Sequence, residues 1–382
     1  MARRPLLGRS PALDGLRGLA LIFVVTYHFT SSRGPFPGGW VGLDVFFVLS
    51  GFLITAMLLD EMRTHGRLSL PMFYARRACR LLPALLVMLA VWTVLLLAFS
   101  DSTWFAATPG GDGSGDPVDI SAALGQVGIT LAYGANWVYA LGSGDAPLAH
   151  LWSLAVEEQF YVVWPLVVLL LVKLPTARRA WPVLALAAVS ATLPFVYYDG
   201  GLGTDRVYFG TDTRAVGMLL GAVAALAWHR RRSTGRPAWH PTARAWAGFT
   251  LIVAFVLTVG NGSVKSLIGP ALMALAAMQV VPYVVDRPSS RLARSLDGRV
   301  LVWLGQRSYA IYLWHYLLAT WLNPLPSLVS IPVGVAASLA LAWASWRWVE
   351  SPALRYSRRF RPMPPTAVAP QTARPRAIAA AA

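Results

Sequence analysis

The 382-residue chain has few charged residues and one cysteine, and it lacks several motifs of soluble enzymes. Only 13% of its residues are charged, whereas about a quarter are charged in a typical soluble domain. A single cysteine, Cys79, excludes an internal disulfide. The chain has no H-x-x-x-x-D pattern of soluble CoA acyltransferases, no G-x-S-x-G elbow of serine hydrolases and no metal-ligand spacing. We therefore expect neither a soluble enzyme of these classes nor a metal centre.

Long apolar runs dominate what is present. Hydrophobic residues make up 56% of the chain, and the mean hydropathy is +0.53. The runs are roughly 18 to 23 residues long, which is the length that a helix needs to cross a bilayer. Residues 1–12 are basic like the start of a signal peptide, but the next apolar run contains Asp14, Arg17 and His28, which favours a retained first span. The pattern predicts an all-α, polytopic membrane helix bundle.

The net charge of +16 is distributed as a topology signal. Of the 33 Lys and Arg residues, 27 lie in short segments between or beyond the apolar runs. Basic loops mark the cytoplasmic side of a membrane protein, whereas nucleic-acid binders gather cations on one folded face. We therefore expect no nucleic-acid partner and a cytoplasmic location for these segments. They are 1–12, 61–80, 173–180, 229–244, 286–299 and the residues after Trp346.

Eleven segments are candidate spans. They are 13–31, 41–60, 81–99, 121–140, 150–172, 181–198, 209–228, 244–260, 267–285, 300–321 and 328–348. The acidic residues 100–119 and the basic residues 173–180 lie on opposite sides, so an odd number of crossings must connect them. The glycine-containing segment 121–140 is therefore expected to be re-entrant or on the surface. About ten transmembrane helices remain, and both termini are predicted to be cytoplasmic.

The same reasoning divides the chain into three parts. Residues 1–12 form a basic cytoplasmic N-terminus, and residues 13–357 form the membrane domain. Residues 358–382 are rich in Arg, Pro and Ala and are expected to be a disordered cytoplasmic tail. The lysine-poor, Ala- and Arg-rich composition suggests a high-GC bacterium. The expected location of the chain is the bacterial inner membrane.

Ionisable residues in the first two spans suggest a site, because such groups are costly in lipid. Arg17 and His28 are eleven residues apart, about three helical turns, so they share one face at a separation of roughly 16 Å. Asp44 is expected near the depth of His28, where a carboxylate would fix the tautomer of the imidazole. Alternatively, Arg17 pairs with Asp14, His28 makes an interhelical hydrogen bond and Asp44 is part of a buried structural pair.

Two further groups are candidates. Arg76, Arg77 and Arg80 lie within about one helical turn at the cytoplasmic surface, where guanidinium groups could bind phosphates. The alternative is ordinary anchoring at lipid headgroups. Glu157, Glu158 and Gln159 lie together in a span and cannot all face lipid. Glu157 must therefore belong to a site or have a buried partner such as an Arg. His150, seven residues earlier, lies on nearly the same helical face.

The remaining candidates are polar or aromatic residues that we expect to contact substrate together with His150. They are Ser50, Trp152, Ser153, Arg214, Tyr309, Tyr312 and His315. For Ser50 the alternative is close helix packing, and Arg214 could instead pair with Asp212. Tyr312 could belong to an interfacial aromatic belt.

Six sequence blocks in order resemble the acyltransferase-3 family of integral-membrane acyltransferases, from residue 11 to about residue 354. The blocks are L-D-G-L-R-G-(x)9-H, G-W-V-G-L-D-V-F-F-V-L-S-G-F-L-I-T, F-Y-A-R-R-A-C-R-L-L-P, H-L-W-S-L-A-V-E-E-Q-F-Y, D-T-R and S-Y-A-I-Y-L-W-H. The resemblance implies ten spans and transfer of an acyl group, often acetyl, from acyl-CoA to a hydroxyl, usually on a carbohydrate. The alternative is a transporter of small acids or lipids, although the two halves show no inverted repeat.

The resemblance also implies roles for individual residues. His28 would be the catalytic base, with Arg17 as its partner in the active channel. Arg77 and Arg80 match an R-x-x-R motif that would bind the CoA phosphates, with Arg76 nearby. Glu157 matches an essential acidic residue, while other matches concern lesser sites: Asp44, Ser50, Trp152 and Ser153. The chain shows no extracytoplasmic hydrolase-like domain and so resembles stand-alone members, whose acceptors are saccharides, glycolipids or sugar-bearing secondary metabolites.

Overall fold

The structure is a computed structural model that describes residues 6–8, 10–99, 119–142, 148–235, 241–260 and 262–360. These residues form helices and no strand, which confirms the prediction of an all-α membrane bundle. The principal helices are α1 (Pro11–Thr30), α2 (Gly42–His65), α3 (Leu70–Phe99), α5 (Ile120–Leu131), α6 (Ala135–Ala140), α7 (Trp152–Leu171), α8 (Ala180–Asp199), α9 (Gly203–Phe209), α10 (Thr211–Ser233), α11 (Thr242–Thr258), α12 (Ser263–Asp286), α13 (Arg291–Leu296), α14 (Arg299–Gln306), α15 (Ser308–Trp321), α16 (Ser327–Ser345) and α17 (Ser351–Ser357).

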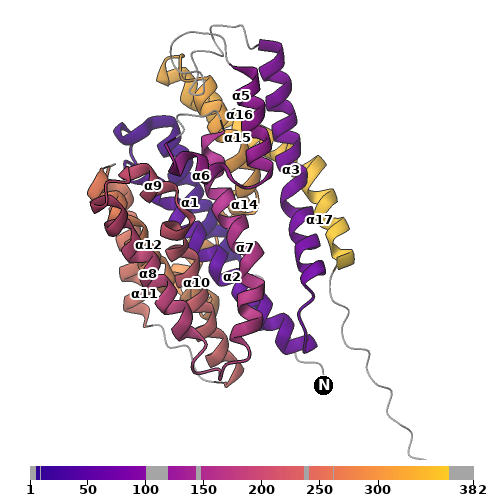
Figure 1. The fold of residues 1–382 in the computed structure, drawn as a ribbon, viewed down its shortest axis with the longest axis vertical. Coiled ribbons are helices and arrows are strands. Elements are labelled where there is room, and N and C mark those ends of the chain that lie inside the picture. The colour runs from indigo at the N-terminus through magenta and orange to yellow at the C-terminus, as the bar shows by residue number, and fades with distance from the viewer. Residues whose placement is uncertain are drawn as a thin grey trace, which may run out of the picture.

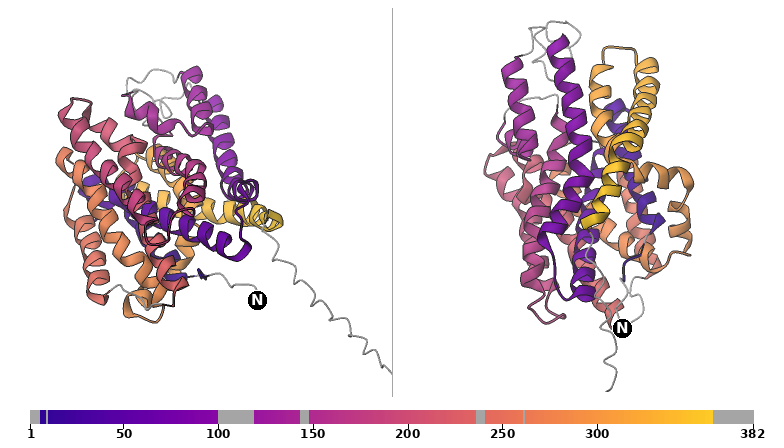
Figure 2. Two further views of the ribbon diagram at one scale, coloured as in Figure 1. Left: turned by 60° about the horizontal axis from the view of Figure 1, so that its bottom comes forward. Right: turned by 90° about the vertical axis from the view of Figure 1, so that its right-hand side faces the viewer.

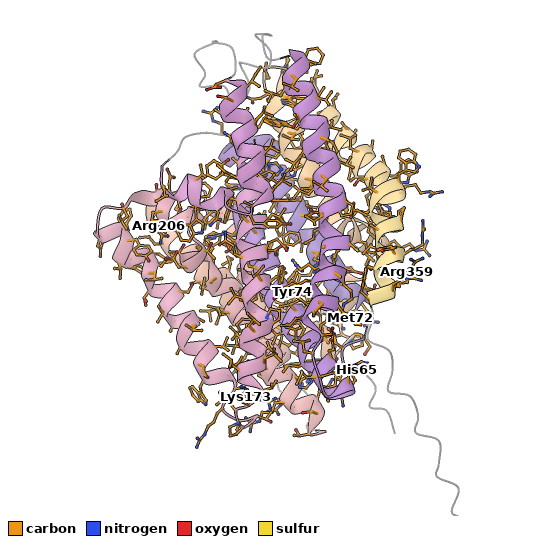
Figure 3. The ribbon with its side chains drawn as sticks, turned by 45° about the vertical axis from the view of Figure 1, so that its right-hand side comes forward. His65, Met72, Tyr74, Lys173, Arg206 and Arg359 are labelled. Atoms are coloured by element: carbon orange, nitrogen blue, oxygen red, sulfur yellow. The ribbon has the colours of Figure 1, made fainter. Side chains whose placement is uncertain are left out.

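The bundle has two sides joined by a central group of helices (Figure 1). Helices α8, α11 and α12 form one side, and α3 lies beside the C-terminal helices α16 and α17 on the other (Figure 2). Between them run α1, α2, α7 and α10, which carry most of the candidate residues. Lys173 and His65 lie near the lower end of the molecule, and Arg206 lies higher, at its left edge (Figure 3).

Helices occupy all ten expected span segments. In the part of the chain that the structure describes, seven helical segments are long and apolar enough to cross a membrane. They are α1, α2 with the turn before it, α3, α7, α8, α12 and the run from α16 to residue 360. The other expected spans correspond to α10, α11 and the pair α14–α15. Segment 121–140 forms two short helices, α5 and α6, and hence no continuous span.

Two sequence expectations about continuity were wrong. Segment 300–321 is not one helix, because α14 ends at Gln306 and α15 begins at Ser308. The basic segment 61–80 is not a loop, because α2 continues to His65 and α3 begins at Leu70, so the arginine group lies in the first turns of a helix. Of the expected tail, Arg358–Phe360 forms a short 3₁₀ helix, and residues 361–382 lie outside the described residues.

Glycines allow the central helices to approach backbone to backbone. A Cβ atom on Gly51 of α2 would lie 1.9 Å from the Met218 carbonyl oxygen of α10, and one on Gly305 of α14 would lie 1.7 Å from the Asp14 carbonyl oxygen of α1. Small residues at such crossings are typical of membrane helix packing, where close contact replaces the hydrophobic driving force of water. These contacts fix the position of α2 against α10 and of α1 against α14.

Candidate functional site

A cavity of about 640 Å³ opens between α1, α2, α3, α7 and α15. It also contacts Gly8 and Ser10, just before α1. Its walls combine apolar side chains, such as Leu43, Phe46 and Ile54, with a set of polar ones. Eight of the residues expected from the sequence line it: Arg17, Ser50, Arg77, Arg80, Ser153, Glu157, Tyr309 and Tyr312. The cavity therefore brings together residues that are separated by almost 300 positions in the chain.

Three arginines that look equivalent in sequence differ in the structure. Arg80 lines the cavity and has no ion pair within the described ranges, and the same is true of Arg17. Arg77 also lines the cavity, but its Nη2 lies 2.6 Å from Glu158 Oε1. Arg76 points elsewhere, and the expectation that all three guanidinium groups share one site is wrong.

The partners of Arg76 explain its direction. Its Nη2 lies 2.9 Å from Glu61 Oε2, and its Nη1 donates to the Phe360 carbonyl oxygen at 2.8 Å. Adjacent residues of a helix point about 100° apart, so Arg76 and Arg77 cannot share a direction. Arg76 thus ties α3 to the end of α2 and to the C-terminal 3₁₀ helix.

Glu157 and Glu158 are adjacent but have different partners. Ser50 Oγ donates to Glu157 Oε1 at 2.6 Å, and Glu157 faces the cavity. Glu158 is buried and is the residue that binds an Arg, as the sequence had suggested for Glu157. The guanidinium of Arg77 also lies 3.1 Å from the centre of the Tyr161 ring. Glu158 and Tyr161 were not among the predicted site residues, although two adjacent glutamates in one helix must point in different directions.

Tyr312 lines the cavity and is hydrogen-bonded to the residues just before and at the start of α7. Its hydroxyl donates to the His150 carbonyl oxygen at 2.5 Å and lies 2.6 Å from Ser153 Oγ. Ser153 Oγ can also donate to the same carbonyl oxygen, at 3.4 Å, so Tyr312, Ser153 and the His150 carbonyl form one hydrogen-bonded group. Tyr309, one turn earlier, donates to the Leu81 carbonyl oxygen at 2.9 Å.

Beyond Tyr312 lies a histidine cluster formed by His28, His150 and His315. His28 Nδ1 is 2.8 Å from His315 Nε2, and the rings of His150 and His315 are 6.2 Å apart between centroids. His150 and His315 are buried, whereas His28 is partly exposed. None of the three lines the cavity. On α1, on α15 and before α7, the histidine lies about one or more turns past the cavity-lining residues, so the cluster sits at its far end.

The predicted neighbour of His28 is elsewhere. Asp44 Oδ1 lies 3.0 Å from Arg214 Nη2, and both side chains are only 1% exposed. The guanidinium of Arg214 also lies 5.3 Å from the Trp152 ring centre and 5.0 Å from that of Tyr208. The structure thus pairs Asp44 with Arg214 and not with His28.

The alternative pairing of Arg214 with Asp212 is not formed either. Asp212 does not bind Arg214, because Arg206 Nη2 lies 2.7 Å from Asp212 Oδ2 and Tyr197 donates to the same oxygen. Neither Trp152 nor Arg214 lines the cavity, and the two contact each other in a buried cluster beside it. Across the described ranges, no group of three or more His, Cys, Asp or Glu residues could hold a metal ion.

Comparison with known proteins finds one family model that matches most of the chain. Residues 10–347 match the family described as an acyltransferase domain. Peptidoglycan O-acetyltransferase OatA of Listeria monocytogenes is 34% identical over 362 residues, which cover 90% of this chain and 55% of that protein. The putative peptidoglycan O-acetyltransferase YrhL of Bacillus subtilis is 34% identical over 368 residues, or 90% of this chain and 54% of that protein.

A putative O-acetyltransferase of Staphylococcus aureus is 32% identical over 376 residues, which cover 90% of this chain and 57% of that protein. The chain thus spans little more than half the length of these curated relatives. No solved structure matches the chain at a significant level.

Proposed function

We propose that this chain, which belongs to the acyltransferase-3 family, transfers an acetyl or short acyl group from acyl-CoA to a hydroxyl at the bacterial inner membrane. The relatives named as peptidoglycan O-acetyltransferases support a saccharide acceptor, and a glycolipid or a sugar-bearing metabolite presents the same chemical group. Family membership, the membrane bundle and the cavity all favour this activity.

The single observation that carries the proposal is the polarity of the cavity along its length. One end holds Arg17 and Arg80, two guanidinium groups without an acidic partner within the described ranges. Charge-assisted bonds from arginine are well suited to phosphate oxygens, which CoA carries. The apolar walls suit the pantetheine arm, and the volume is that of an ordinary small-molecule pocket. The other end stops at Tyr312, next to the histidine cluster.

The chemistry places the thioester at the far end. The acceptor hydroxyl reaches His28 from outside the cavity, because His28 is partly exposed but does not line it. His28 takes the hydroxyl proton as a general base while the oxygen attacks the thioester carbonyl. The C–S bond then breaks, an ester forms, and the proton returns from His28 to the thiolate of CoA. Tyr312 has to turn aside for the thioester to meet His28.

Glu157 contributes to binding within the cavity. Its carboxylate is held by Ser50 and faces the space that the pantetheine arm would fill. A carboxylate is an acceptor only, so it suits the amide N–H groups of that arm. Arg77, fixed by Glu158 and Tyr161, supports the phosphate end without being free to reorient.

The test uses purified full-length protein in detergent, with radiolabelled acetyl-CoA and a soluble oligosaccharide acceptor. We expect His28→Gln to lower kcat by about 10² to 10⁴-fold, the usual contribution of a general base. Arg80→Ala should raise the KM for acetyl-CoA by about tenfold, since one lost contact of about 1.4 kcal/mol has that effect.

Arg76→Ala is the matched control on the same helix. It removes the same charge but leaves the cavity lining intact, so both kinetic constants should stay near wild-type values. Equal effects of Arg76→Ala and Arg80→Ala would contradict the assignment of the phosphate end. Wild-type product formation by His28→Gln would overturn the proposed reaction, and so would movement of a solute across the membrane without any acyl product.

A further inference from the structure

The hydrogen bonds of His315 determine which of its nitrogens carries the proton. His315 lies in α15 and is fully buried. Its Nδ1 lies 2.8 Å from the Tyr312 carbonyl oxygen and 3.2 Å from the Ile311 carbonyl oxygen. A carbonyl oxygen accepts and never donates, so Nδ1 is the protonated nitrogen. In the neutral ring, Nε2 is then left with its lone pair.

The tautomer of His28 follows from that of His315. His315 Nε2 and His28 Nδ1 are 2.8 Å apart, which is a hydrogen-bond distance. Two lone pairs cannot form such a bond, so His28 Nδ1 must be the donor. The second nitrogen of His28, Nε2, therefore bears the lone pair and is the atom able to take a proton. The backbone carbonyls thus fix the tautomer of His315, and His315 in turn fixes the tautomer of His28.

We infer that His315 is a positioning residue that holds His28 in the Nδ1–H tautomer and leaves Nε2 as the base. This inference rests on the proposed function of His28. In many enzymes a carboxylate plays the corresponding part beside a histidine base. Here the carboxylate expected from the sequence, Asp44, is bound to Arg214, and a neutral imidazole takes its place.

The arrangement also determines where the proton goes during the reaction. When His28 Nε2 accepts a proton, the Nδ1–H bond to His315 helps to stabilise the imidazolium, because hydrogen bonds from a charged donor are stronger. The chain of bonds ends at the Tyr312 and Ile311 carbonyls, which cannot take up a proton. The proton therefore stays on His28 until the departing thiolate removes it.

Two substitutions separate positioning from mere packing. In His315→Gln the amide oxygen can still accept from His28 Nδ1, whereas in His315→Leu nothing can. We expect His315→Leu to lower kcat about 10²-fold and His315→Gln to lie within about tenfold of wild type, with the KM for acetyl-CoA unchanged in both. KM is insensitive because His315 does not line the cavity. His229→Gln, which alters a buried histidine in α10, is the control and should retain wild-type kinetics.

A spectroscopic measurement tests the tautomer without relying on activity. In protein labelled with ¹⁵N-histidine, the signals of His28 are identified by their absence in His28→Gln. Wild type should show a protonated Nδ1 and an unprotonated Nε2 for His28. His315→Gln should preserve that pattern, and His315→Leu should give a mixture of tautomers.

The two readouts keep the inference apart from the proposed function. A protein that shows the expected tautomer but no acyl transfer would overturn the function and leave the positioning geometry intact. A His28 protonated on Nε2 in wild type would overturn the inference, whatever the activity. Wild-type kcat in His315→Leu, or equal losses in His315→Leu and His315→Gln, would do the same.

Discussion

The buried pair of Asp44 and Arg214 gives a prediction in which a structural and a catalytic role lead to different results. Asp44 lies in α2, and Arg214 lies in α10, at the crossing that Gly51 makes possible. Their closest atoms are 3.0 Å apart, and each side chain is 1% exposed. We consider Asp44→Asn, which removes one charge with little change in volume, Arg214→Gln, which removes the opposite charge with a shorter side chain, and the double variant.

The expected magnitude follows from burial. At 3.0 Å and an effective dielectric constant of about 20, the attraction is about 6 kcal/mol. Removing both ions from water costs several kcal/mol each, so the intact pair adds little net stability. Removal of one partner leaves an uncompensated buried charge, which typically costs about 3–5 kcal/mol. Each single variant should therefore be destabilised by about that amount, and the double variant by less than either.

The measurement is thermal unfolding of the purified protein in detergent, followed by tryptophan fluorescence, together with kcat per folded molecule. Asp212→Asn serves as the comparison, because the Arg206–Asp212 pair is more exposed, at 14% and 31%, and such pairs contribute at most about 1 kcal/mol. The structural reasoning would be refuted if Asp44→Asn kept wild-type stability and lost kcat. That outcome would return Asp44 to a role beside His28.

Two further predictions concern helix packing and the hydrogen bond of Tyr312. Gly51→Ala would place a Cβ 1.9 Å from the Met218 carbonyl oxygen, so the melting temperature should fall sharply, whereas Gly125→Ala, with no heavy atom within 4 Å, should not lower it. Comparable melting temperatures for both variants would contradict the close helix crossing. Tyr312→Phe leaves the His150 carbonyl without its 2.5 Å donor and should lower stability by about 1–3 kcal/mol. An unchanged unfolding curve would show that this hydrogen bond contributes nothing measurable to stability.

Much of the fold was predictable because the relevant signals are local. The length of an apolar run decides whether a helix can cross a bilayer, and loop charge decides its direction. Helices accordingly occur at all ten expected segments, and 121–140 is divided into α5 and α6. The break at Arg307 was not predictable from these signals, since segment 300–321 is apolar enough to look continuous. Whether a run bends there depends on what packs against it.

Some of the residues that line the cavity were also predictable from local signals. Polar side chains within apolar runs are costly unless they share an interior, so Arg17, Ser50 and Glu157 could be expected together, and they line one cavity. Helical periodicity also places Arg17 and His28 on one face of α1. It does not tell how far along that face a cavity extends, and this one stops short of His28.

The sequence by itself determined the membrane bundle, the order of its spans and eight of the polar residues that line the cavity. Only the tertiary structure decided the partners: Asp44 with Arg214, Arg77 with Glu158, and His28 with His315. The physical reason is that periodicity orients a side chain about its own helix axis. Which neighbour it meets depends on the rotation, tilt and depth of a second helix, and those are set by packing contacts between segments far apart in the chain.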